Sequence, residues 1–181
     1  MLKVIAGKNR GYKIKFLPSK KTRPTSNIVK ESIFNIMQSD IAGSRFLDLF
    51  SGSGQIGIEA ISRGAKQVTF VDNDYYCINT LRSNINKLNI LQQCTIIKSD
   101  VMIYLDECDN DFDIVFLDPP YSVGLVEKTL NNVMKNVKKC DIIVETDKSE
   151  ILDNKYLDTY IQKEYYYGRK KLTVYKRKRK Y

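Results

Sequence analysis

Short runs of continuous apolar residues alternate with amphipathic segments along most of this chain. The apolar runs at residues 46–50, 68–71, 95–97, 114–117 and 142–144 each predict a strand. Between them, apolar residues recur at helical spacing, most regularly at Ile78, Leu81, Ile85 and Leu88. Short apolar strands separated by helices are typical of a parallel sheet that is covered on both faces. We therefore predict an α/β fold.

Both ends of the chain depart from this alternation of strands and helices. Residues 156–167 and 172–175 predict two strands joined around Gly168-Arg169, which we expect to form an antiparallel hairpin at the sheet edge. Residues 2–16 predict a small basic hairpin, followed by a loop in which Thr25 or Ser26 caps a helix over 28–37. The expected fold is a mostly parallel seven-stranded sheet in one domain, 1–181, with residues 1–26 as an extension within it.

The charge of the chain is unevenly distributed. Its 181 residues include 30 Lys and Arg against 21 Asp and Glu, a net charge of +9. Residues 1–30 and 161–181 together carry +17, which leaves −8 for the middle of the chain. An acidic centre between basic ends suggests a catalytic core for a cationic or metal-bound ligand, with two arms that contact a nucleic acid. The alternative is that the basic ends are only solvated tails.

The absence of histidine narrows the possible chemistry. The four cysteines form no C-x-x-C pair and the chain has no histidine, so a zinc site of the usual Cys/His kind and histidine-based acid-base catalysis are excluded, and we expect no metal. The chain begins without an apolar leader segment, and its apolar stretches are too short for a membrane span. We expect a reduced, cytoplasmic protein.

Candidate ligand-binding residues follow the predicted strands, because open parallel sheets bind ligands beyond the carboxyl ends of their strands. After the first strand, Gly52 and Gly54 form a tight turn that lacks the lysine of a nucleotide phosphate loop, and that could instead serve helix packing. The second strand ends at Asp72, which suits a ribose diol, whereas Asp74 suits a helix cap. Asp100 follows the third strand and suits either an adenine amine or a cap.

The fourth strand ends in the tetrapeptide Asp118-Pro119-Pro120-Tyr121. The two prolines hold an extended loop, so that the Asp118 carboxylate and the Pro119 carbonyl can converge as hydrogen-bond acceptors. Tyr121 adds an aromatic face. Two acceptors beside a stacking surface suit a planar base that carries an exocyclic amine.

Taken together, these motifs resemble those of the S-adenosylmethionine-dependent amino-methyltransferases. More narrowly, Ile-Ala-Gly at 5–7, Arg-Pro-Thr at 23–25, residues 29–35 and Gly-Ile-Glu-Ala at 57–60 resemble the RsmD family. That family comprises bacterial enzymes that methylate a guanine N2 in 16S ribosomal RNA of the small subunit. The resemblance spans almost the whole chain and implies a Rossmann-like class I methyltransferase fold.

The resemblance also implies roles for individual residues. The cofactor would be S-adenosylmethionine without a metal, bound by Asp48, Phe50, Ser51, Gly52, Gly54, Asp72, Asn73, Asp100 and Val101. The catalytic residues would be Asp118, Pro119, Pro120 and Tyr121. The basic residues expected to contact RNA phosphates are Arg10, Lys20, Lys21, Arg23, Arg169, Lys170 and Lys171. The partner would be 16S ribosomal RNA or an assembly particle of the small subunit, and the enzyme a monomer without a membrane partner.

Three other functions are compatible with parts of the sequence. A DNA adenine-N6 methyltransferase uses the same amine chemistry, but only about 30 N-terminal residues remain here for a recognition module. A non-catalytic RNA-binding assembly factor would keep the fold without turnover. A dinucleotide-dependent oxidoreductase is disfavoured because the glycine pattern departs from G-x-G-x-x-G.

Overall fold

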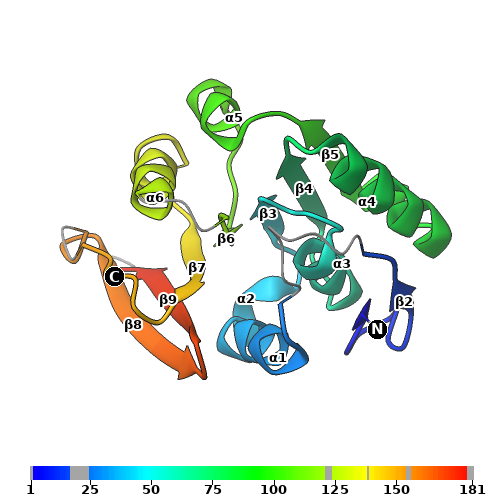
Figure 1. The fold of residues 1–181 in the computed structure, drawn as a ribbon, viewed down its shortest axis with the longest axis horizontal. Helices are drawn as coiled ribbons and strands as arrows, with labels where there is room; N and C mark the ends of the chain where they lie inside the picture. The colour runs from blue at the N-terminus through cyan, green and yellow to red at the C-terminus, as the bar shows by residue number, and fades with distance from the viewer. Residues whose placement is uncertain (1, 17–24, 121–123, 138, 154–155, 179–181) are drawn as a thin grey trace.

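The computed structural model describes residues 2–16, 25–120, 124–137, 139–153 and 156–178. Within these residues the centre of the molecule is a seven-stranded sheet in the order β5-β4-β3-β6-β7-β9-β8 (Figure 1). Its strands are β3 (Arg45–Leu49), β4 (Gln67–Asp72), β5 (Cys94–Lys98), β6 (Ile114–Leu117), β7 (Asp141–Asp147), β8 (Tyr160–Tyr167) and β9 (Lys170–Arg177). The first five run parallel, and β9 pairs antiparallel with both β7 and β8. The mostly parallel sheet with an antiparallel C-terminal hairpin is thus confirmed.

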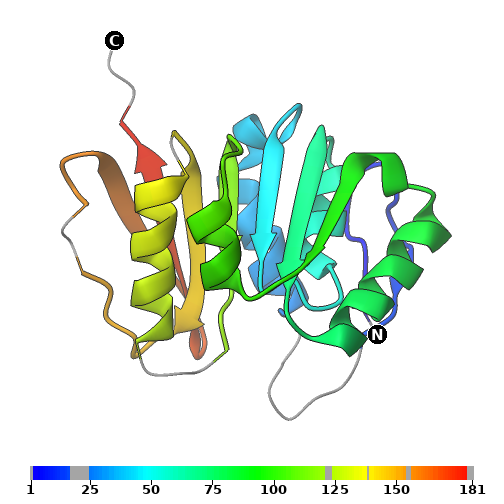
Figure 2. The same ribbon diagram turned by 90° about the horizontal axis from the view of Figure 1, so that it is seen from above.

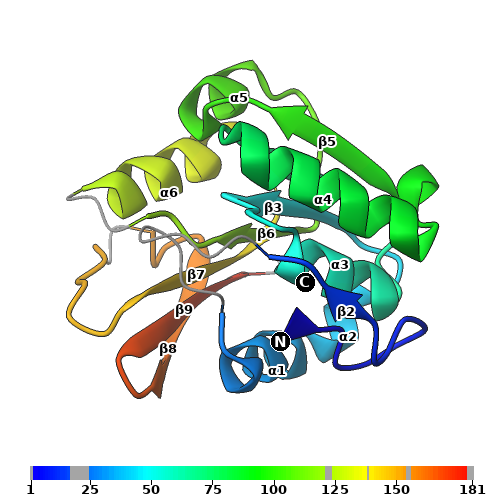
Figure 3. The same cartoon turned by 45° about the vertical axis from the view of Figure 1, so that its right-hand side comes forward.

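Helices cover both faces of the sheet. Residues of α1 (Asn27–Ile36), α2 (Gln38–Ile41), α3 (Gln55–Ser62) and α4 (Tyr75–Leu88) pack in the apolar core of one face. Residues of α5 (Val101–Glu107) and α6 (Leu125–Asn136) pack on the other face, where Figure 2 shows these two helices in front of the strands. Figure 3 shows α1, α2 and α3 on the opposite side from α5 and α6.

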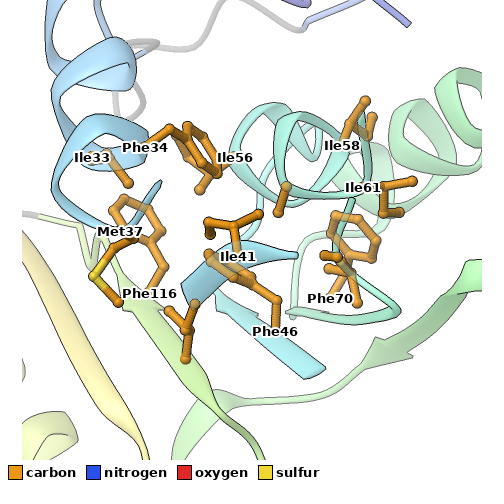
Figure 4. Packing of buried hydrophobic residues seen from close by; sticks show 14 of the residues in the cluster. Ile33, Phe34, Met37, Ile41, Phe46, Ile56, Ile58, Ile61, Phe70 and Phe116 are labelled. Carbon is orange, nitrogen blue, oxygen red and sulfur yellow. The ribbon is translucent and has the colours of Figure 1, made fainter. Parts of the chain in front are cut away.

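The apolar core arises from the alternation of side chains along each strand. Phe46, Phe70 and Phe116, from β3, β4 and β6, are at most 2% exposed and join the cluster formed with α1 and α3 (Figure 4). Their strand neighbours Leu47 and Leu117 belong to the cluster on the other face. Because every second residue of a strand faces the same side, the residue two places after each phenylalanine also faces α1 and α3.

The basic N-terminal extension is a hairpin, as predicted. Its strands β1 (Leu2–Lys3) and β2 (Lys13–Ile14) pair antiparallel, with Leu2 opposite Ile14. The turn between them lies against the end of α3, since the Lys8 amide donates to the Ser62 carbonyl at 2.9 Å. Figure 1 shows this hairpin and the β8-β9 pair on opposite sides of the molecule.

A buried ion pair attaches this hairpin to the helices. Glu59 of α3 and Lys30 of α1 have fully buried side chains, with 3.2 Å between Lys30 Nζ and Glu59 Oε2. Glu59 accepts the backbone amides of Ile5 and Ala6 at 2.8 and 2.9 Å. Lys30 Nζ donates to the Lys3 carbonyl at 2.7 Å. Each charge thus has an opposite charge and a hydrogen bond to the hairpin backbone, as a buried charge requires.

Several local features differ from the sequence-based expectation. Ser26 caps α1, as predicted. Ile28 was expected on the apolar face of this helix but is 68% exposed, and the buried face includes Lys30. Helix α5 was not predicted, because it has only seven residues and so shows little periodicity. The first strand of the C-terminal hairpin begins at Tyr160, four residues later than Tyr156.

We expect Lys30→Met to destabilise the protein, because Glu59 would keep its charge in the core with Arg63 as its remaining salt-bridge partner, and the Lys3 carbonyl would lose its donor. Breaking a buried pair by removing one member costs about 3–5 kcal/mol. Urea unfolding followed by circular dichroism measures this loss. The matched control is Glu31→Gln, which removes a charge from an exposed residue one place along the same helix. Equal stability of the two variants would contradict a structural role for the pair.

Candidate active site

The order of the strands reverses between β3 and β6. From β3 the chain continues to β4 and β5 on one side, and it returns to build β6 and β7 on the other. In open α/β sheets, the carboxyl ends of the strands at such a reversal form the ligand-binding crevice. The candidate residues after these two strands, including the glycine-rich turn and Asp118, therefore lie at the position where a site is expected.

Four neighbouring parallel strands place an acidic side chain on the same face at this edge. Asp72, Asp48, Asp118 and Glu145 come from β4, β3, β6 and β7 or directly follow them, each two residues after an apolar residue of the face covered by α1 and α3. Glu145 was not among the residues singled out from sequence. Its signal was available, because an acid directly follows the apolar run at 142–144, as it does the runs at 68–71 and 114–117.

The turn after β3 has an unusual backbone. Phe50 adopts a left-handed conformation, with φ of +59°, which is strained for a bulky residue. The Gly52 amide donates to Asp72 Oδ2 at 2.8 Å, and this bond ties the turn to the neighbouring strand β4. Asp72 also accepts the Asp74 amide at 2.8 Å on its other oxygen. Asp72 thus positions the turn, and each oxygen keeps a lone pair for a ligand.

The two glycines of this turn have different surroundings. A Cβ on Gly54 would lie 2.3 Å from Leu81 Cδ1, so Gly54 permits close packing against α4. A Cβ on Gly52 would meet no atom of the described structure within 4 Å. The helix-packing alternative therefore applies to Gly54, whereas Gly52 faces open space.

Burial raises the pKa values of carboxyl groups at this edge. Asp48 is 2% exposed, and burial, aided by the charge of Asp72, raises the pKa of its carboxyl to about 7 although it accepts the Gly57 amide at 2.8 Å. Burial and the charge of Glu145 raise the pKa of Asp118 to about 8, against the opposing effect of Lys170. Such a group of carboxyls favours a cationic ligand, which would stabilise their ionised forms.

The remaining candidates of the cofactor set lie at helix starts. Asp74 caps α4 through a 2.9 Å bond from the Cys77 amide, as expected, and the neighbouring Asn73 is exposed. Asp100 caps α5, because its Oδ1 accepts the Met102 amide at 2.8 Å. The capping alternative for Asp100 is therefore realised, with Val101 buried beside it.

The basic candidates fall into three groups. Arg10 and Arg169 are exposed, the first on the hairpin turn beside the end of α3 and the second at the carboxyl edge next to β9. Lys170 and Lys171 are turned toward protein carboxylates. Lys171 is 3% exposed, and its Nζ bonds Glu164 Oε1 at 2.8 Å. Outside the described residues lie Lys20, Lys21, Arg23 and, among the catalytic candidates, Tyr121.

The structure gives Lys170 and Lys171 protein partners, and their expected phosphate contacts stay a prediction. A run of basic residues looks uniform in sequence, but alternation along β9 points these two side chains into opposite faces of the sheet, where carboxylates hold them. Across the described part of the chain, no helix could span a membrane, and no cluster of three or more His, Cys, Asp or Glu is arranged for a metal ion.

Comparison with known sequences identifies close relatives. The family model described as "Conserved hypothetical protein 95" matches residues 2–176. The YlbH protein of Bacillus subtilis is 33% identical and covers 98% of this chain and 100% of its own length. A Haemophilus influenzae protein named "Ribosomal RNA small subunit methyltransferase D" is 38% identical and covers 83% of this chain and 81% of its own length.

Solved structures agree with this relationship. The yhhF protein of Escherichia coli superposes with a TM-score of 0.83 at 28% identity, over 97% of each chain. The HI0767 protein of Haemophilus influenzae gives 0.81 at 33% identity, over 97% of this chain and 98% of that chain. With its sheet order and reversal point, the chain thus has the α/β fold of class I methyltransferases, and it belongs to the RsmD/YlbH family of S-adenosylmethionine-dependent methyltransferases.

Proposed function

We propose that this protein transfers a methyl group from S-adenosylmethionine to the exocyclic N2 of a guanine in 16S ribosomal RNA. The observation that carries the proposal is the position of Asp118. It follows β6 at the strand reversal, on the same face as Asp48 and Asp72 of the two neighbouring strands. Relatives named "Ribosomal RNA small subunit methyltransferase D" support ribosomal RNA as the substrate.

The residues of the turn after β3 fit the cofactor. Ser51 Oγ is buried and has no hydrogen-bond partner among the described residues, so a polar ligand atom would satisfy it. The open space beside Gly52 allows a ligand to approach the backbone, and the carboxyls of Asp48 and Asp72 favour positive charge. When bound, the cofactor supplies an activated methyl group on a sulfonium. We assign the ribose hydroxyls to Asp72 and the adenine to Asp100 and Val101.

The chain's own residues would act mainly by positioning. Asp118 and the Pro119 carbonyl would accept the two N–H bonds of the guanine amine and aim its lone pair at the methyl group. As a carboxylate, Asp118 would also stabilise the positive charge that develops on nitrogen and accept the released proton. Tyr121 retains its proposed role of stacking on the base, and Pro120 keeps the loop extended. This chemistry uses neither histidine nor a metal.

Replacing Asp118 tests the proposed reaction directly. We expect Asp118→Ala to lower the rate by about 100-fold or more, because both amine positioning and charge stabilisation are lost. The measurement supplies labelled S-adenosylmethionine with unmethylated small subunits, naked ribosomal RNA or DNA, and identifies the methylated nucleoside by mass spectrometry.

The same assay separates the alternatives. N2-methylguanosine in ribosomal RNA supports the proposal, whereas N6-methyladenine in DNA would replace it with a DNA methyltransferase. Cofactor binding without transfer to any substrate would favour a non-catalytic assembly factor. A near wild-type rate for Asp118→Ala would remove this residue from the mechanism.

The two glycines of the turn provide a matched pair of variants. We expect Gly52→Ala to fold with a loss of about 1–2 kcal/mol from its left-handed backbone, and to bind the cofactor at least 10-fold more weakly because the methyl group occupies the approach to the turn. Gly54→Ala should lose more stability, since its Cβ would clash with Leu81. Calorimetric titration with S-adenosylmethionine, together with urea unfolding, separates these effects. Unchanged affinity for Gly52→Ala would place the cofactor elsewhere.

The exposed arginines should contribute to RNA affinity through phosphate contacts. We expect Arg169→Ala and Arg10→Ala each to lower the slope of log affinity against log salt concentration by about 1. Filter binding with unmethylated ribosomal RNA over a range of salt concentrations measures the slope. The control is Lys135→Ala, an exposed lysine at the end of α6 on the other face. A slope that is unchanged in both arginine variants would exclude these contacts.

A further inference from the structure

We propose that Lys170 and Glu145 are positioning residues that together set the pH range in which Asp118 is ionised. This inference rests on the proposed role of Asp118 and deepens it, because a carboxylate must be ionised to stabilise positive charge on the amine nitrogen. It also gives a function to the ion pair between Lys170 and Glu145.

One ammonium group lies beside two carboxylates at the carboxyl edge. Lys170 Nζ is 2.8 Å from Glu145 Oε1 and 3.9 Å from Asp118 Oδ1. The side chain of Glu145 is only 1% exposed, whereas those of Lys170 and Asp118 are 24% and 28% exposed. Glu145 thus holds the lysine from the protein interior, and the more exposed Asp118 lies near the same cation.

The sheet explains why these residues meet. Leu117 pairs with Val144 in the parallel register, which places the following residues, Asp118 and Glu145, at the same level. On β9, Lys170 lies two places from Leu172, the direct partner of Glu145, and so shares its face. The contact depends on β9 pairing next to β7, because this brings a lysine 52 positions away from Asp118 to the site.

Further contacts hold Glu145 in place. Its second oxygen, Oε2, accepts a 3.1 Å hydrogen bond from Thr25 Oγ1, just before α1. The Thr25 carbonyl in turn accepts Gln55 Nε2 of α3 at 2.8 Å. Both carboxylate oxygens of Glu145 are therefore held by protein groups, and its side chain is only 1% exposed, so Glu145 is arranged to hold Lys170 and not to contact substrate.

The charges around Asp118 predict opposite effects for the two residues. Among the described residues, the charged groups that act on it are Glu145 from β7, Lys170 from β9 and Asp48 from β3, while Thr25 and Gln55 beside Glu145 are neutral. Glu145 and Asp48 raise the pKa of Asp118, and Lys170 lowers it. Loss of the lysine should therefore shift ionisation of Asp118 to higher pH, and loss of the Glu145 charge should shift it to lower pH.

Two measurements follow Asp118 over pH 6–9. The first is carboxyl carbon NMR of the full-length protein labelled at aspartate, with Asp118→Asn identifying the resonance. The second is the methylation rate with S-adenosylmethionine and the RNA substrate both well below their KM values, which reports ionisations of the free enzyme. Ionisations of the substrates are common to all variants, so differences between variants belong to the protein.

For Lys170→Met we expect the midpoint of Asp118 titration and the acid limb of the rate profile to rise by about one pH unit or more. For Glu145→Gln both should fall. The double variant should return toward the wild-type profile, because the removed charges are opposite in sign. Lys170→Arg keeps the positive charge. Its pH–rate profile should therefore have its acid limb at the wild-type pH, even if its maximal rate is lower.

A structural role alone would lower the rate at every pH without opposite shifts. Lys148→Met is the matched control, since it removes an exposed lysine from the same edge and should leave the midpoint unchanged. Midpoints that stay at the wild-type value, or that move in the same direction in both variants, would overturn the inference. A reduced salt slope for Lys170→Met with an unshifted midpoint would also overturn it, in favour of a phosphate contact. Because NMR needs no turnover, absence of methyl transfer by the wild type would refute the proposed function while the titration still decides this inference.

Discussion

The alternation of side chains along four parallel strands is the constraint on which the site depends. In β4, β3, β6 and β7 the residue that packs against α1 and α3 is apolar, and the residue two positions later is acidic. The same two-residue period therefore builds the core and places the acidic residues on the same face at the carboxyl edge of the sheet. A shift of one residue in any of these strands would turn both its apolar residue and its acid to the opposite face.

Placing several carboxyls at one edge has an energetic cost that the structure offsets in two ways. Backbone amides bind Asp48 and Asp72, and Lys170 lies between Asp118 and Glu145. Hydrogen bonds to a charged group contribute about 1.5–3 kcal/mol each, which is less than the several kcal/mol that burying a charge costs. The raised pKa values of Asp48 and Asp118 reflect the part of this burial cost that is not offset. A cationic ligand bound at this edge would reduce that cost.

The buried pair of Lys30 and Glu59 connects this site to the N-terminal hairpin. Glu59 lies on α3, whose first turn carries Gln55 next to the site and whose last turn supports the hairpin through Ser62. Lys30 lies on α1, directly after the segment that hydrogen-bonds Glu145. The resemblance to RsmD proteins at 29–35 and 57–60 therefore includes the two residues that hold the extension in position.

Much of the architecture follows from local patterns in the sequence. Apolar runs, helical spacing, the cap residues Ser26 and Asp74 and the motif after β6 depend on neighbours within a few residues, so their physical effects can be read along the chain. Helix α5 could not be predicted in this way, because its seven residues show little periodicity. The exposure of Ile28 could not be predicted either, because α1 buries Lys30 through its ion pair with Glu59.

Only the tertiary structure decided which groups act together. The sequence by itself determined that acids follow the strands, but not that Glu145 shares Lys170 with Asp118, since this depends on β9 pairing beside β7. It likewise grouped Gly52 with Gly54 and Lys170 with Arg169. In the structure, Gly54 packs against Leu81 whereas Gly52 borders open space, and Lys170 pairs with Glu145 whereas Arg169 is exposed. Local chemistry determines what each segment can form, whereas the surroundings of a side chain depend on strand order and packing between segments distant in sequence.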